Sequence, residues 1–229
     1  MMDNFLVFGV FLLVVVWIEA GSMGSDCGFN CVPKHPQQKY CDADFVIRGQ
    51  VKNRNYTTKD GMPNMETGMG GDMPFNYYIV YTVAIEKVFK GPSYYEEGME
   101  MYIKTEASNS MCGIGNLMNR KSYLLSGQKE EDTMMNINGC NWVTEFKKLT
   151  SAQKTGVKRQ YGANCNSCEI EDCENRQCKA SAKTRCVYNP AGSKSCHQQF
   201  SYCILKKNGV CKWDRKRDEM KECLRENTK

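Results

Sequence analysis

The chain has little histidine and lacks the short motifs that mark common enzyme active sites. Its two histidines, His35 and His197, lie far apart in 229 residues. No His-Glu-x-x-His zinc motif, Gly-x-Ser-x-Gly nucleophile motif or glycine-rich phosphate loop occurs. The carboxylates form no recognisable acid–base pattern. We therefore predict that the chain is not an enzyme and holds no cofactor of its own, and that His35, beside Pro36, is a cap or turn residue.

Long hydrophobic runs are missing after residue 20. The one long apolar run covers residues 5–18, which is shorter than the ~20 residues of a membrane-spanning helix. Its length, followed by the small residues Ala20 and Ser22, is typical of a secretory signal peptide. A retained anchor and a buried helix are the alternatives. We expect a signal peptide at residues 1–20, an extension at residues 21–26, and a mature chain that is secreted to the extracellular space or matrix without a membrane span.

Cysteine, by contrast, is abundant. The 14 cysteines are an even number, which in a secreted chain predicts seven disulfides. Five lie in residues 27–164 and nine in residues 165–223. The first part is long enough to bury its own core, whereas the second is predicted to depend on cross-links. Cys165-x-x-Cys168 also matches half a zinc site or a redox pair, but no second such pair accompanies it, so a disulfide role is favoured.

Five segments have the pattern of β-strands. The clearest is residues 77–89, in which Tyr77, Ile79, Tyr81, Val83 and Ile85 fall on one face. The other predicted strands are residues 45–51, 99–103, 122–126 and 134–138. Five strands separated by turn signals predict a small closed or partly open barrel.

Two helices are expected beside these strands. A short one covers residues 36–41, because proline fits the first turn of a helix. A longer one begins after Thr150, which forms a capping box with Gln153, and runs to about Tyr161. Gly162 is expected to end it.

Asn55-Tyr56-Thr57 is an N-glycosylation sequon, which predicts a surface position with a glycan on Asn55. The following segment, residues 58–76, interleaves glycine with methionine and has no helix or strand period. It is either a flexible hairpin tip or an adaptable partner surface, since methionine is soft and unbranched.

Two stretches resemble the start of the mature tissue inhibitors of metalloproteinases. They are Cys-Val-Pro-Lys-His-Pro-Gln-Gln-Lys-Tyr-Cys at residues 31–41 and Asp-Phe-Val-Ile-Arg at residues 44–48. Further matches occur in the same order at residues 88–92, Cys112-Gly113, residues 123–127, Cys140, Tyr161, Cys165 and residues 211–213. The resemblance covers nearly all of the mature chain. It implies a mainly-β fold with flanking helices: a five-stranded OB-type (netrin-like, NTR) barrel at residues 27–165, then a small disulfide-rich C-terminal subdomain with a basic tail at residues 166–229.

The resemblance also implies most of the disulfide pairing. The implied bonds are Cys27–Cys112, Cys31–Cys140, Cys41–Cys165, Cys168–Cys211, Cys173–Cys178 and Cys186–Cys203. Cys196 and Cys223 have no counterpart in that scheme, and we predict that they bond to each other.

Family members inhibit extracellular zinc metalloendopeptidases through their first mature cysteine, whose amino nitrogen and carbonyl oxygen chelate the catalytic zinc. The matching position two residues before Cys31 is Phe29, and the candidate zinc-facing residue, Cys27, lies four residues before it. The only zinc implied is the one bound in the target protease. The implied protease-binding edge consists of Cys27, Phe29, Asn30, Cys31, Val32, Pro33, Ser110, Met111 and Cys112.

A second function remains open on the same scaffold. Residues 165–229 carry 14 basic and nine acidic side chains. A non-inhibitory matrix protein that binds sulfated polysaccharide would use this excess, although excesses of this size also occur on ordinary solvated surfaces. No nucleic-acid partner is expected.

Overall fold

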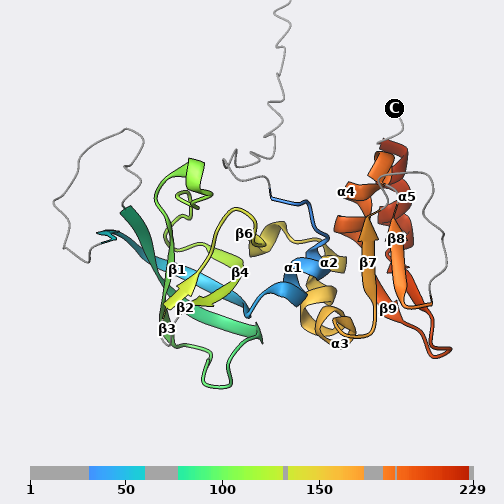
Figure 1. The fold of residues 1–229 in the computed structure, drawn as a ribbon, viewed down its shortest axis with the longest axis horizontal. Helices are drawn as coiled ribbons and strands as arrows, with labels where there is room; N and C mark the ends of the chain where they lie inside the picture. The colour runs from blue at the N-terminus through green and yellow to red at the C-terminus, as the bar shows by residue number, and fades with distance from the viewer. Residues whose placement is uncertain (1–30, 60–76, 131–133, 173–182, 189, 227–229) are drawn as a thin grey trace, which may run out of the picture.

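The computed structural model describes residues 31–59, 77–130, 134–172, 183–188 and 190–226. Its first part is a closed ring of five strands, in which each strand pairs with the next and the last returns to the first (Figure 1). The order around the ring is β1 (Phe45–Thr58), β2 (Tyr77–Lys90), β3 (Glu100–Glu106), β5 (Met134–Asn136) and β4 (Ser122–Glu130). Within this ring β3 and β5 pair in parallel, and the other described pairs are antiparallel. The ring agrees with the predicted OB-type barrel.

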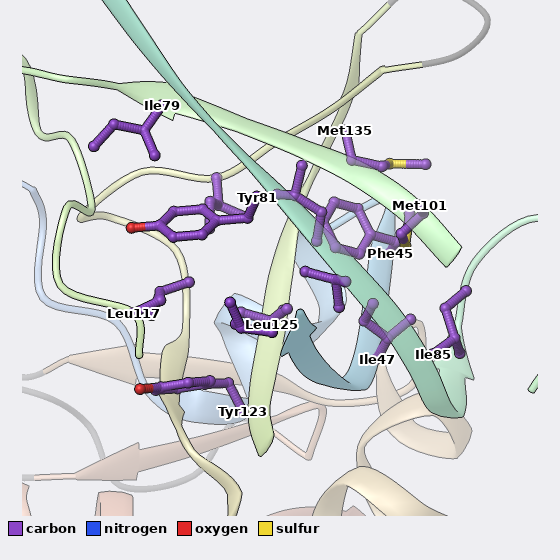
Figure 2. Packing of buried hydrophobic residues seen from close by; sticks show 14 residues of the cluster. Phe45, Ile47, Ile79, Tyr81, Ile85, Met101, Leu117, Tyr123, Leu125 and Met135 are labelled. Atoms are coloured by element: carbon purple, nitrogen blue, oxygen red, sulfur yellow. The ribbon is translucent and has the colours of Figure 1, made fainter. Parts of the chain in front are cut away.

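The interior of the ring is a single apolar core (Figure 2). The alternation predicted for β2 is confirmed, because Ile79, Tyr81 and Val83 are all at most 2% exposed. The other buried members of this core are Phe45, Ile47, Val51, Ile85, Met101, Ile103, Leu117, Tyr123, Leu125, Met135 and Ile137.

Strand β1 is longer than predicted, and a sixth strand, β6 (Val143–Glu145), was not predicted. Residues 52–58 are polar and exposed for most of their length, so they carry no alternation to read. They form a strand because β2 offers a long partner, up to the pair Thr58 and Tyr77. The glycine- and methionine-rich segment between these two residues lies, apart from its first two positions, outside the described residues.

Helix α1 (Pro36–Asp42) begins as predicted, with His35 as its N-cap. Thr150 and Gln153 form the predicted capping box at the start of α2 (Ser151–Thr155). The expected end at Gly162 is wrong, because the chain continues through the π-helical segment η3 (Gly156–Gln160) into α3 (Tyr161–Asn164). A Cβ on Gly162 would lie 3.1 Å from the Tyr40 hydroxyl, so this glycine permits close approach to α1 rather than ending the helix.

The C-terminal part is built from small elements beside these helices (Figure 1). Its elements are the parallel pair β7 (Glu169–Asp172) and β8 (Arg185–Tyr188), helix α4 (Pro190–Phe200), the hairpin β9 (Ser201–Leu205) and β10 (Cys211–Arg215), and helix α5 (Arg217–Glu226). Much of the expected basic tail is therefore ordered as β10 and α5. None of the helices in the described ranges is long and apolar enough to cross a membrane.

Five disulfides join the described residues, and they are five of the seven expected pairings. They are Cys31–Cys140, Cys41–Cys165, Cys168–Cys211, Cys186–Cys203 and Cys196–Cys223. The expected pairs Cys27–Cys112 and Cys173–Cys178 involve Cys27, Cys173 and Cys178, which lie outside the described residues.

Candidate functional site

The first segment of the candidate edge is the stretch before α1. Val32, Pro33 and Lys34 are exposed there, and Val32 has 74% of its surface accessible. Cys31 is disulfide-bonded to Cys140, which fixes this stretch to the loop after β5. The remaining predicted edge residues, Cys27, Phe29 and Asn30, lie outside the described residues.

The second segment follows β3, where the chain makes one 3-10 turn, η1 (Asn109–Met111). Ser110 is exposed, whereas Met111 is half-buried. Cys112 adopts a left-handed conformation with φ of 60°, and its carbonyl oxygen accepts a 2.7 Å hydrogen bond from Gly139 N–H. A Cβ on Gly113 would lie 1.9 Å from the Glu106 carbonyl oxygen, so only glycine allows this tight return.

The fold brings the two segments together. The Sγ atoms of Cys31, Cys112 and Cys140 all lie within 4.8 Å of one another. All three cysteines are disulfide-bonded, so their sulfurs are cross-links rather than thiolate ligands for a metal. The predicted residues Cys31, Val32 and Pro33 therefore lie at the same site as those around Cys112, although the sequence separates them by about eighty positions.

Behind this edge, α1 is hydrogen-bonded to the C-terminal part. The side chain of Gln37 is 2% exposed and clamps the backbone of Cys203, donating to its carbonyl oxygen at 2.9 Å and accepting from its N–H at 2.8 Å. Gln38 donates to the carbonyl oxygen of Ile170 at 3.0 Å. In the neighbouring helix α3, the side-chain oxygen of Asn164 accepts a 2.8 Å hydrogen bond from Leu205 N–H. The first segment of the edge therefore leads into helix α1, which is bonded both to the barrel part and to the C-terminal part.

His35 lies fully buried at this joint. Its Nδ1 accepts from Gln37 N–H at 3.1 Å, so Nε2 carries the proton and donates to the carbonyl oxygen of His197 at 3.1 Å. Burial lowers the pKa of His35 from 6.5 to about 4, and nearby His197 adds to the shift, against the opposing effect of the hydrogen bond to that carbonyl. Burial likewise lowers the pKa of His197 to about 4. Both rings lie against Trp213, with centroids 5.2 Å and 4.8 Å from it. This neutral, aromatic packing gives His35 a structural role.

Sequence reasoning missed the joint itself. Gln37, Gln38 and His197 carry no motif, and two adjacent glutamines ordinarily predict a solvated helix surface. One available signal was that α1 begins five residues after the disulfide-bonded Cys31 and contains a second such residue, Cys41, which limits its orientation.

The C-terminal part carries exposed basic side chains on its hairpin and last helix, although α5 itself has four exposed carboxylates against three basic groups. The exposed basic side chains there include Lys207, Lys212, Arg215, Lys216, Arg217, Lys221 and Arg225. The carboxylate of Asp214 lies 3.9 Å from the amino group of Lys206 and offsets part of its positive charge. The surface is compatible with an acidic partner.

Comparison with known proteins gives a consistent family assignment. The family model for tissue inhibitor of metalloproteinase matches residues 25–213. Metalloproteinase inhibitor 3 of Xenopus laevis is 31% identical over 214 residues, covering 92% of this chain and 90% of the relative. Metalloproteinase inhibitor 3 of Gallus gallus is 33% identical over 190 residues, or 81% of each chain. Metalloproteinase inhibitor 2 of Homo sapiens is 31% identical over 193 residues, again 81% of each.

Proposed function

The chain belongs to the tissue inhibitor of metalloproteinase family, and we propose that it is a secreted inhibitor of extracellular zinc metalloendopeptidases. The proposed inhibitory edge is residues 27–33 together with residues 110–112. The observation that carries the proposal is the convergence of Cys31, Cys112 and Cys140 within 4.8 Å. It joins two exposed segments into one ridge on a cross-linked scaffold.

Rigidity supports this role for the edge. The Cys31–Cys140 bond holds the first segment, and the hydrogen bond from Gly139 to Cys112 holds the second. An edge ordered before binding loses little conformational entropy when it enters a protease cleft. Val32 supplies an apolar side chain that is 74% exposed. Burying it against a partner removes apolar surface from water, which favours binding.

The proposed mechanism does not depend on an amino-terminal zinc ligand. A catalytic zinc keeps one coordination position open, and a free amino group on Cys27 would be able to occupy it. With the predicted extension at residues 21–26, that nitrogen is part of a peptide bond and is a poor ligand. We therefore propose that edge contacts provide most of the affinity, and that the extension decides whether the zinc is reached.

Two measurements test the proposal. Amino-terminal sequencing of the secreted protein establishes whether Cys27 is the first residue. Titration against the catalytic domain of a matrix metalloendopeptidase then measures the inhibition constant of the wild type and of Val32→Glu. A buried charge in the cleft should raise that constant at least about tenfold. The matched control is Leu205→Glu, at an apolar residue that is 44% exposed on the C-terminal part, and it should leave the constant unchanged. No inhibition by the wild type, or equal effects of the two variants, would refute the edge.

Polyanion binding is the second candidate, favoured by the exposed basic residues between Lys207 and Arg217. Retention on immobilised heparin should fall as salt rises, because exposed charges are screened. The variant Lys212→Gln with Lys216→Gln should elute earlier. Retention that ignores both salt and these substitutions would exclude this candidate.

A further inference from the structure

We propose that Asn55 carries an N-linked glycan and that this glycan covers the outer face of strands β1, β2 and β3. The sequon Asn55-Tyr56-Thr57 lies within β1 and is not part of the proposed inhibitory edge, so the proposed inhibition does not use it. The proposal names the chain's own oligosaccharide as the occupant of this face.

The strand geometry directs Asn55 outward. Neighbouring residues of a strand face opposite sides, and Arg54 on one side of Asn55 faces the barrel mouth, where it donates a 2.8 Å hydrogen bond to the carbonyl oxygen of Gly115. The side chain of Asn55 is exposed. Asn55 pairs with Val80 on β2, and Val80 pairs with Lys104 on β3. The attachment point therefore opens directly onto the three-stranded outer face.

This face carries an exposed aromatic side chain two strands away from Asn55. Tyr102 on β3 has 61% of its surface exposed. Its partner on β2 is Thr82, a small side chain that leaves the ring standing clear. The parallel register of β3 and β5 places Met134, which is 38% exposed, beside Tyr102. Two large apolar side chains on this face are therefore in contact with water.

The lysines Lys59 and Lys104 on this face both form ion pairs. Lys104 forms an ion pair with Glu130 and lies 4.4 Å from the centre of the Tyr78 ring. Lys59 pairs with Glu106 at 3.1 Å and lies 5.0 Å from the same ring. The face therefore offers little to a polyanion. An uncharged sugar, whose C–H groups pack on aromatic rings, is a better match, and the corresponding face of OB-type barrels binds oligosaccharides.

The distances allow one glycan to cover the patch. Asn55 and Lys104 are two strand spacings apart, which is about 10 Å, and Tyr102 lies two residues, about 7 Å, further along β3. An N-linked oligosaccharide is a bulky surface group that extends over such a span.

The first test measures the modification. The chain is expressed in animal cells and the secreted protein is weighed by intact mass spectrometry before and after treatment with a peptide N-glycosidase. Wild type should lose one glycan mass, Thr57→Ala should carry none, and Thr57→Ser, which keeps the sequon, should match wild type. Asn55→Gln provides a second variant in case Thr57→Ala is not secreted. A wild-type mass that the glycosidase leaves unchanged would overturn the proposal.

The second test measures coverage. Tyrosine nitration of the folded protein, read out by peptide mass spectrometry, compares glycosylated with deglycosylated protein. Tyr102 should react at least about threefold faster once the glycan is removed. Tyr94, which is 53% exposed in the loop beyond the far end of β2, is the matched control and should not change. Equal rates at Tyr102 in both forms would overturn the placement of the glycan on this face.

Discussion

The two parts of this molecule bury different material. The barrel core consists of aliphatic and aromatic side chains such as Ile103 and Leu125, both fully buried. In the C-terminal part, the main buried cluster consists of Ile170 and four disulfide-bonded cysteines: Cys168, Cys186, Cys203 and Cys211. The barrel encloses enough apolar surface to fold by the hydrophobic effect. The smaller part gains its stability mainly from cross-links that restrict its unfolded state.

The joint between the two parts is polar, which neither core would suggest. Gln37 and His35 replace the solvent at backbone groups of Cys203 and His197, so these buried groups remain hydrogen-bonded. The first segment of the proposed inhibitory edge, residues 27–33, ends two positions before His35 in the chain. Substitutions in the barrel, in the C-terminal part or in the joint therefore measure separately how much each contributes to stability.

The largest expected effect comes from removing a cross-link of the C-terminal part. The variant Cys168→Ser with Cys211→Ser opens a loop whose ends are 43 residues apart, which should lower stability by about 4 kcal/mol. Hydrogen exchange should show lost protection in β9 and β10, while β2 stays protected. Leu125→Ala is the converse control and should reduce protection in β2. Equal loss in both parts after the cysteine substitutions would contradict the division described above.

Acidification should weaken the joint next. Burial holds the pKa of His35 at about 4, below its ordinary 6.5, so between these values the unfolded chain binds a proton that the folded chain does not. The stabilisation is fully present above pH 6.5, falls by about 3 kcal/mol as pH drops to 4, and then levels off. Urea unfolding at pH 7, 5.5 and 4 measures it. His35→Asn keeps a capping side chain without its titration and should reduce the dependence to the part that comes from His197, whose pKa is likewise lowered to about 4; an unchanged slope would rule out His35 as a source.

Truncating the amide clamp has a smaller expected cost. Gln37→Ala leaves the buried N–H and carbonyl of Cys203 without their partner, which should lower the free energy of unfolding by about 2 kcal/mol. Gln128→Ala is the control, because its side chain makes one exposed hydrogen bond to the Asp42 carbonyl oxygen, and it should cost less than about 0.5 kcal/mol. Similar losses from the two variants would show that the clamp adds nothing to the joint.

The smallest effect is expected at Tyr161, on the barrel side of the joint. Its hydroxyl is buried and has no hydrogen-bond partner among the described residues, and burial raises its pKa. Tyr161→Phe should leave stability unchanged or raise it by up to about 1 kcal/mol. Tyr40→Phe removes a hydroxyl that donates to the Phe89 carbonyl oxygen at 2.8 Å and should cost about 1 kcal/mol. Thermal unfolding of both variants measures these changes in stability. A clear loss of stability in Tyr161→Phe would show that the Tyr161 hydroxyl has an unrecognised partner.

Local patterns predicted the barrel well because each strand carries its own signal. The alternation in β2 and the capping residues His35 and Thr150 act within a few positions of themselves. The second half of β1 was missed because its pairing with β2, and not its composition, makes it a strand. The helices α4 and α5 were missed for a similar reason, since they pack against each other around the Cys196–Cys223 bond and Met220.

The sequence by itself determined the family resemblance, the five barrel strands and the cysteine framework, because these depend on residue types and spacings along the chain. Only the tertiary structure decided that Cys31 and Cys112 meet at one edge, that Gln37 clamps Cys203, and that Asn55 opens onto an aromatic face. Each of these relations joins residues from different elements. The geometry that brings them together is set by packing and strand register, which no local pattern records.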